Sequence, residues 1–155
     1  MDTMDSDTLL RLLAATGCGV LIGISHDLRG KPAGTRTLGL VALGAALLTA
    51  GTTQLPMIAG HPDAVSRVIQ GAIQGIVTGI GFLGAGAIMR GPNEVRGLTT
   101  AASVWVTAVL GIICMLSPWP LIGIGLLIAV VLSAFAHPLE NWLERRRKTE
   151  SDQES

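Results

Sequence analysis

Charged residues are scarce in this sequence. Asp, Glu, Lys and Arg make up 14% of the 155 residues, apolar residues make up 49%, and the mean hydropathy is +0.55. A soluble globular domain usually has about a quarter of its residues charged. The composition therefore excludes an ordinary soluble domain and favours a chain that resides in a membrane.

Cysteine is equally sparse. Cys18 and Cys114 are the two cysteines of the chain, and each lies inside an apolar run, where a thiol behaves as a small hydrophobic group. A closed zinc site needs about four ligands, and neither cysteine has a histidine or carboxylate close by in the sequence. A disulfide and a cysteine metal site are therefore both disfavoured, and we expect no cofactor.

The sequence also lacks the patterns of a cleaved leader and of a catalytic centre. Its first residues carry Asp2, Asp5 and Asp7 in place of a basic leader, so we expect the first apolar segment to stay in the mature protein. No paired carboxylates, no nucleophile beside a base and no histidine-rich pattern can be identified. We therefore expect a protein that is not an enzyme and does not bind nucleic acid.

Apolar segments are abundant. A helix of roughly 20 residues crosses a bilayer core of about 30 Å, and the lipid excludes open strands because their amides would lack partners. The sequence predicts an all-α, polytopic membrane bundle of about five transmembrane helices over residues 9–137. An acidic tail (1–8) precedes the bundle, and a basic, polar cytoplasmic tail (138–155) follows it. The predicted spans are 9–24, 38–53, 68–89, 98–116 and 119–135.

Basic residues gather on one side of these spans. Arg11 and Arg67 are the exceptions. By the positive-inside rule, this bias predicts an outside N-terminus and a cytoplasmic C-terminus. The nine basic residues on the predicted inner side are Arg29, Lys31, Arg36, Arg90, Arg96, Arg145, Arg146, Arg147 and Lys148.

The third apolar segment is rich in glycine. Three glycines recur every four residues, a spacing that lets another helix approach closely in lipid. We therefore expect this segment at the centre of the bundle, with a homodimer seam as a variant. The glycine density at its end also allows an unwound stretch that lines a cleft. The predicted helix-packing glycines are Gly71, Gly75, Gly79, Gly81, Gly84 and Gly86.

Polar residues of the third and fourth segments are predicted to face each other. Hydrogen bonds between such side chains are worth about 1 kcal/mol each in lipid, although the same groups can line a polar pathway or bond back to their own helix. The residues are Gln70, Gln74 and Thr78 in the third segment and Thr99, Thr100, Ser103 and Thr107 in the fourth.

Charged residues near the helix ends are further binding or coupling candidates. Arg36 and Arg96 each shortly precede an apolar helix, where an arginine can pair with a carboxylate, a phosphate headgroup or a partner protein. The other candidates are Arg29, Asp63, Arg67 and Glu94. We interpret His26, His61 and His137 as solvated loop histidines.

The glycine block Gly-Ile-Gly-Phe-Leu-Gly-Ala-Gly (79–86) and the motif Val-Arg-Gly-Leu-Thr-Thr-Ala-Ala (95–102) resemble the MgtC/SapB family of bacterial inner-membrane proteins. Ala33 and Gly34 in the first loop, between Arg29 and Arg36, add to a resemblance that covers roughly residues 9–135. It implies a multi-pass protein of the bacterial inner membrane, linked to growth under magnesium limitation and to virulence. It also implies regulation of other membrane machines, including the ATP synthase.

This chain departs from the family pattern at two places. Ser25 and His26 stand where the family usually shows Glu-Arg, and Glu94 stands where it often has Asn. Many members carry a cytoplasmic C-terminal domain of the amino-acid-sensing type, and we expect this chain to be a short form without one.

Two functions remain open. The first is a regulator that docks onto another membrane complex. The second is a transporter of magnesium or another small solute, with polar candidates Asp63, Gln74, Glu94, Thr99 and Thr100. Mg²⁺ prefers carboxylate oxygens, whereas the apolar segments offer amides and hydroxyls, so the first function is favoured.

Overall fold

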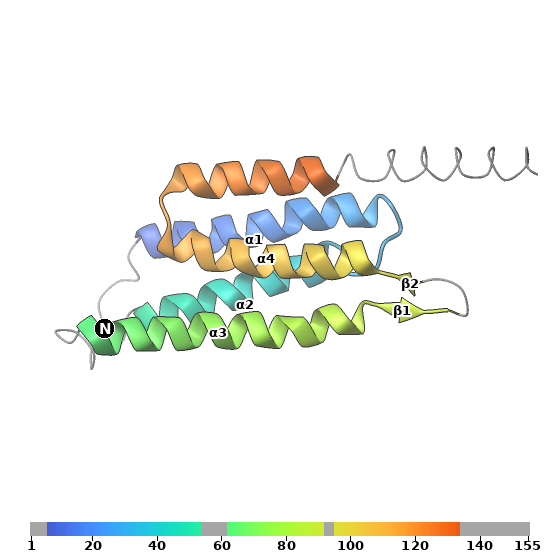
Figure 1. Ribbon diagram of the computed structural model, residues 1–155. Helices are drawn as coiled ribbons and strands as arrows, with labels where there is room; N and C mark the ends of the chain where they lie inside the picture. Colours follow the sequence, from blue (N-terminus) through green and yellow to red (C-terminus); the bar gives the residue numbers. More distant parts are fainter. Residues whose placement is uncertain (1–5, 54–61, 92–94, 134–155) are drawn as a thin grey trace, which may run out of the picture.

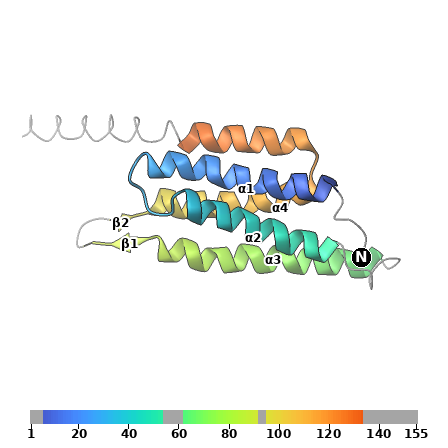
Figure 2. The same cartoon turned by 180° about the vertical axis from the view of Figure 1, so that it is seen from behind.

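The computed structural model describes residues 6–53, 62–91 and 95–133. In chain order its elements are α1 (Ser6–Asp27), α2 (Thr35–Thr53), α3 (Pro62–Gly86), β1 (Met89–Arg90), β2 (Val95–Arg96), α4 (Leu98–Leu116) and a final helix, Trp119–Ser133. The helices run side by side along one axis, and the short hairpin extends beyond one end of the bundle (Figures 1 and 2).

Among the described residues, four of the five helices are long and apolar enough to cross a membrane, whereas Trp119–Ser133 is shorter. The predicted all-α polytopic bundle is therefore confirmed. The helices begin a few residues earlier than the apolar segments suggest: α3 starts at Pro62, whereas its apolar segment starts at Val68. Apolar runs define the part of a helix that lipid surrounds, and the helical hydrogen bonds continue into the polar residues beside it.

The hairpin between α3 and α4 is absent from the sequence prediction. Met89 pairs with Arg96, and Arg90 pairs with Val95, in an antiparallel register. Gly97 ends the hairpin with a φ of 89°, and a Cβ there would lie 1.9 Å from the carbonyl oxygen of Ala87. Only glycine fits such a position, so the motif that begins at Val95 has a conformational reason for its glycine.

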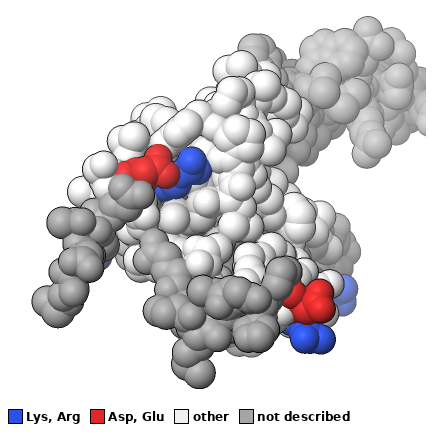
Figure 3. Space-filling view, turned by 90° about the vertical axis from the view of Figure 1, so that its left-hand side faces the viewer, with Lys and Arg blue, Asp and Glu red and all other residues white. Residues whose placement is uncertain are grey.

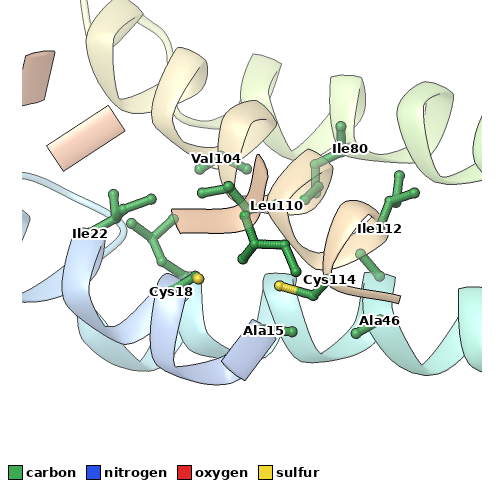
Figure 4. Packing of buried hydrophobic residues seen from close by; sticks show 13 residues of the cluster. Ala15, Cys18, Ile22, Ala46, Ile80, Val104, Leu110, Ile112 and Cys114 are labelled. Atoms are coloured by element: carbon green, nitrogen blue, oxygen red, sulfur yellow. The ribbon is translucent and has the colours of Figure 1, made fainter. Parts of the chain in front are cut away.

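The core lies where α1, α2 and α4 meet. Buried side chains include Ala15 and Ile22 of α1, Ala46 of α2, and Val104 and Leu110 of α4 (Figure 4). Cys18 and Cys114 lie near each other in this core (Figure 4), and both cysteines are free. They contribute there as small hydrophobic groups, as expected from their apolar surroundings.

Two isolated glycines let the core helices approach each other. A Cβ on Gly19 of α1 would lie 2.3 Å from the carbonyl oxygen of Leu38 in α2. A Cβ on Gly111 of α4 would lie 2.4 Å from the carbonyl oxygen of Ala42, also in α2. Close backbone approach of this kind is the main source of helix association in lipid, so these two glycines bring α1, α2 and α4 together.

The third segment does not form the centre of the bundle, and that prediction is wrong. Within α3, only Ile80 and Gly84 are buried, among the residues whose burial is described. A Cβ on Gly84 would contact Ala101 of α4 at 3.7 Å, whereas the other predicted packing glycines face open space. Those glycines are Gly71, Gly75, Gly79, Gly81 and Gly86, and their packing role toward another chain stays a prediction.

The helix α3 is continuous from Pro62 to Gly86, so the alternative of an unwound stretch from Gly79 to Gly86 is wrong. The physical reason is that a helix exposed to lipid keeps its own hydrogen bonds even where its glycine content is high, because no water replaces them.

Arg11 holds three elements together at one end of the bundle. Its guanidinium pairs with Asp7 at 2.6 Å and donates to the carbonyl oxygens of Cys114 and Ser117 at 2.9 and 3.0 Å. It also lies 5.1 Å from the ring centroid of Trp119. A cation at the C-terminal end of α4 satisfies its last carbonyls, which explains why this arginine lies apart from the other basic residues.

The two ends of the bundle differ in charge. The α1–α2 loop and the hairpin share one end, and the basic residues described there are Arg29, Lys31, Arg36, Arg90 and Arg96. At the other end, acidic and basic atoms lie side by side in small groups (Figure 3), where Asp7 and Arg11 begin α1 and Asp63 and Arg67 begin α3.

A methyl group at Gly111 should destabilise the bundle, whereas one at Gly79 should not. Gly111→Ala forces α4 away from α2 and should lower the free energy of unfolding by about 1–3 kcal/mol. Gly79→Ala meets open space and should be neutral, or stabilising by up to about 1 kcal/mol through helix propensity. Thermal unfolding of both variants in detergent measures the difference, and equal midpoints would contradict the described α2–α4 contact.

The charge asymmetry predicts which end of the bundle faces the cytoplasm. In a variant without Cys18 and Cys114, a cysteine at exposed Pro32 should be protected from a membrane-impermeant maleimide in intact cells. A cysteine at exposed Thr53, near the opposite end, should be labelled. Permeabilised cells provide the control in which both react. The reverse labelling pattern would contradict the predicted orientation.

Candidate functional site

The helix α3 has two chemically different faces. Its apolar residues Ile73, Ile76 and Ile80 pack against the core of the other helices. The opposite face is exposed, at the i, i+3, i+4 spacing of one side of a helix. We call this the outer face of α3, and it consists of Arg67, Gln70, Gly71, Gln74, Gly75, Thr78 and Gly79.

This arrangement is the opposite of what lipid favours. An amide group has two donors and an acceptor, and leaving it without partners in hydrocarbon costs several kcal/mol. Neither Gln70 nor Gln74 forms a hydrogen bond with another described side chain or backbone group. A hollow of about 580 Å³ lies beside these amides, lined also by Ile69, Ile73 and Val77. The outer face therefore has unmet hydrogen-bonding capacity and space for a partner.

The predicted meeting of polar residues between the third and fourth segments is wrong. Gln74 and Thr78 lie on the outer face, away from α4, whereas Thr100 and Thr107 are buried in the core. Ser103 bonds to a residue of α1. The apolar side of α3 covers α4, and this turns the amides outward.

A second group of polar residues lines a pocket of about 210 Å³ between α1, α4 and the final helix. We call it the basic-end pocket, because it lies at the end that holds the α1–α2 loop. Its lining residues are Ile22, His26, Lys31, Thr99, Ala102, Ser103, Val106, Ala129, Leu132 and Ser133.

His26 is the innermost polar group of this pocket. Its side chain is only 2% exposed, and its Nε2 lies 3.1 Å from Ser103 Oγ. Because the Ser103 hydroxyl donates to the carbonyl oxygen of Thr99 at 2.9 Å, it accepts from the imidazole. The other ring nitrogen lies 3.4 Å from the carbonyl oxygen of Pro32. Both imidazole nitrogens therefore face oxygen atoms.

The interpretation of His26 as a solvated loop residue is wrong. The helix α1 continues to Asp27, so His26 stays on the same face as the buried residues Ala15, Cys18 and Ile22. The spacing of these four residues along the sequence is the signal that would have identified a buried histidine.

The α1–α2 loop builds the mouth of the pocket. Asp27 accepts hydrogen bonds from the backbone N–H and the hydroxyl of Thr35, the first residue of α2. Arg29 donates to the carbonyl oxygen of Ser133 and so ties the loop to the final helix. Lys31 Nζ lies 3.4 Å from Thr99 Oγ1 in the first turn of α4. The loop thus connects the three helices that enclose the pocket.

The predicted candidates are divided between these two places. Arg67, Gln74 and Thr78 share the outer face of α3, with exposed Asp63 near its start. Thr99 lines the basic-end pocket, and Arg29 holds one of its walls. Arg36 and Arg96 are exposed at the same end, Thr100 is buried, and Glu94 lies outside the described residues. The sequence reasoning did not identify His26, Lys31 or Ser133 as site residues, and it linked Ser103 to the third segment instead.

Comparisons with known proteins agree with the membrane fold. Residues 12–142 match the MgtC family. The protein MgtC of Salmonella typhimurium is 48% identical over 106 residues, which are 68% of this chain and 42% of that protein. SrpB of Synechococcus elongatus is 38% identical over 74% of this chain and 66% of its own length.

A third relative is YhiD of Escherichia coli, provisionally named a magnesium transporter. It is 37% identical over 71% of this chain and 51% of its own length. No solved structure matches the chain. This chain spans less than half the length of the Salmonella protein and about half that of the Escherichia protein. On the extent of the family match and of these identities, the chain belongs to the MgtC family.

Proposed function

We propose that this chain is a multi-pass inner-membrane protein that regulates another membrane protein by docking onto it through the outer face of α3. The observation that carries the proposal is the direction of that face. In a helix that is long and apolar enough to cross a bilayer, Gln70, Gln74 and Thr78 point away from the bundle, beside a row of open glycines.

A partner helix would fill the space beside the glycines of this face and would supply hydrogen-bond partners to its amides. Gly71, Gly75 and Gly79 let its backbone approach closely, and Gln70 and Gln74 donate and accept hydrogen bonds worth roughly 1 kcal/mol each. From Arg67 to Gly79 the face extends about 18 Å along the axis, more than half of a bilayer core. It is therefore long enough for several turns of a partner helix.

Family membership supports a link to magnesium adaptation, and we infer that the docked partner takes part in it. The same glycine row would also fit a homodimer seam, and self-association through it is the alternative to docking onto a different protein.

Transport of magnesium or another small solute is the second candidate function. The name of the Escherichia relative favours it, and so does the polarity of the outer face, which could line a pathway if several chains assembled. The oxygen donors on that face are neutral amides and hydroxyls, with the carboxylate of Asp63 near one end, whereas Mg²⁺ prefers several carboxylate or water oxygens. Docking fits these side chains better.

Photocrosslinking tests the docking face. A benzoylphenylalanine at Gln74 should crosslink one defined membrane protein in native membranes, because a bound helix would lie within reach. The same group at Leu127, which is exposed on the final helix, is the control and should not yield this product. Mass spectrometry identifies the product.

Gly75→Leu should abolish both the crosslink and growth under magnesium limitation, because its side chain would occupy the space of the partner backbone. Gly123→Leu, at another open glycine on the final helix, should leave both unchanged. Crosslinking of the chain to itself alone, or equal growth of the two variants, would contradict docking onto a different protein.

Flux measurements separate the two functions. Purified protein in vesicles should give no more magnesium uptake than empty vesicles, because docking moves no ion. Gln74→Ala and Glu94→Ala serve as comparison variants. If the wild type takes up magnesium and either variant lowers that uptake severalfold, the result would favour transport over docking.

A further inference from the structure

The basic-end pocket combines a charged mouth with an apolar interior. Lys31 and Thr99 lie toward the loop, whereas Val106, Ala129 and Leu132 line the part between α4 and the final helix. A ligand that fills this pocket must therefore present a polar group at the end of the bundle and hydrocarbon along the helices. This is the chemistry of an amphiphile at a membrane interface.

The mouth of the pocket is positively charged. Lys31 pairs with no carboxylate of the described residues, and the Thr99 hydroxyl, 3.4 Å from its Nζ, is neutral. Asp27, four residues earlier, is engaged by the backbone N–H and hydroxyl of Thr35. The carboxylate of Asp27, at the end of α1, thus caps α2 and leaves the charge of Lys31 available.

The N-terminus of α4 adds to this positive potential. Thr99 lies in the first turn of α4, and Gly97 provides no side-chain cap for that turn. The first amides of a helix carry partial positive charge and bind phosphate readily. The Thr99 hydroxyl accepts from Lys31, so its own proton is free to donate to an anion.

We propose that the basic-end pocket binds an anionic phospholipid. Lys31 and the Thr99 hydroxyl contact its phosphate, and one acyl chain passes along Val106, Ala129 and Leu132. Arg29 holds the wall of this pocket through the carbonyl oxygen of Ser133. Basic pockets between transmembrane helices are suited to such headgroups. The proposal is independent of the outer face of α3.

A phospholipid fits better than free inorganic phosphate, although the two share the same charged group. The lining beyond Thr99 and Ser103 is apolar, and a free anion would gain nothing from it. An acyl chain instead packs against this apolar lining and so anchors the headgroup at the mouth of the pocket.

Native mass spectrometry of the intact chain in detergent tests the proposal. Titration with phosphatidylglycerol should show saturable binding that phosphatidylcholine does not match. Lys31→Met keeps the apolar stem and should weaken phosphatidylglycerol binding about tenfold or more, as expected for loss of a charge-assisted hydrogen bond. Arg90→Met removes a charge from the exposed strand at the same end, outside the pocket, and should weaken binding less than about fivefold.

Ala129→Leu fills the apolar part of the pocket without changing charge, and it should also reduce binding while the thermal midpoint without added lipid stays that of the wild type. Inorganic phosphate at constant ionic strength should not displace the lipid. Equal losses in Lys31→Met and Arg90→Met would overturn the proposal, as would unchanged binding in Ala129→Leu. Full displacement by inorganic phosphate would show a site for the free anion and would also overturn it.

Discussion

The bilayer offers no hydrogen bonds to a helix surface, and this constraint decides how each face of this protein has to be used. The backbone of α1, α2, α3 and α4 satisfies itself, so the remaining question is where the polar side chains go. The buried hydroxyl of Thr49 donates back to the carbonyl oxygen of Ala45 in its own helix. His26 and Ser103 satisfy each other within the bundle. The amides of Gln70 and Gln74 do neither, and this is the basis on which we propose that a partner binds the outer face of α3.

The position of the glycines decides which helices form the core. Gly19 and Gly111 each stand where a Cβ would collide with a backbone carbonyl oxygen, and they bring α1 and α4 against α2. The regular row at Gly71, Gly75 and Gly79 has no such neighbour. Once α1, α2 and α4 form the core, α3 can add only one face to it, and its isoleucines bury more surface there than its glycines would. The glycine row therefore stays exposed on the outer face of α3, where we propose that a partner helix packs.

The sequence predicted the class of fold well but could not predict the contacts. The hydropathy of each segment can be read from its own residues, and it predicts the number of helices. The positions of Arg29, Arg36 and Arg96 between the segments predict that the basic loops lie at the same end of the bundle. The spacing of glycines along a helix does not identify the helix that packs against them. An i, i+4 row indicates that some backbone can approach, and nothing in the row identifies whether the neighbour belongs to the same chain. His26 was missed for a related reason, because the apolar segment ends before the helix does.

The departure of this chain from the Glu-Arg pair of the family becomes understandable at the buried end of α1. The Ser25 hydroxyl donates to the carbonyl oxygen of Ile22 at 2.7 Å, so its proton is satisfied within its own helix. His26 places a ring between α1, α4 and the α1–α2 loop, with Ser103 and Pro32 as its oxygen neighbours. An arginine at this position would keep its charge and its five donors in a space that is 2% exposed, and it would need a carboxylate close by. Beside the pocket, permanent positive charge is carried by Lys31, at its mouth, and by Arg29, which holds one of its walls.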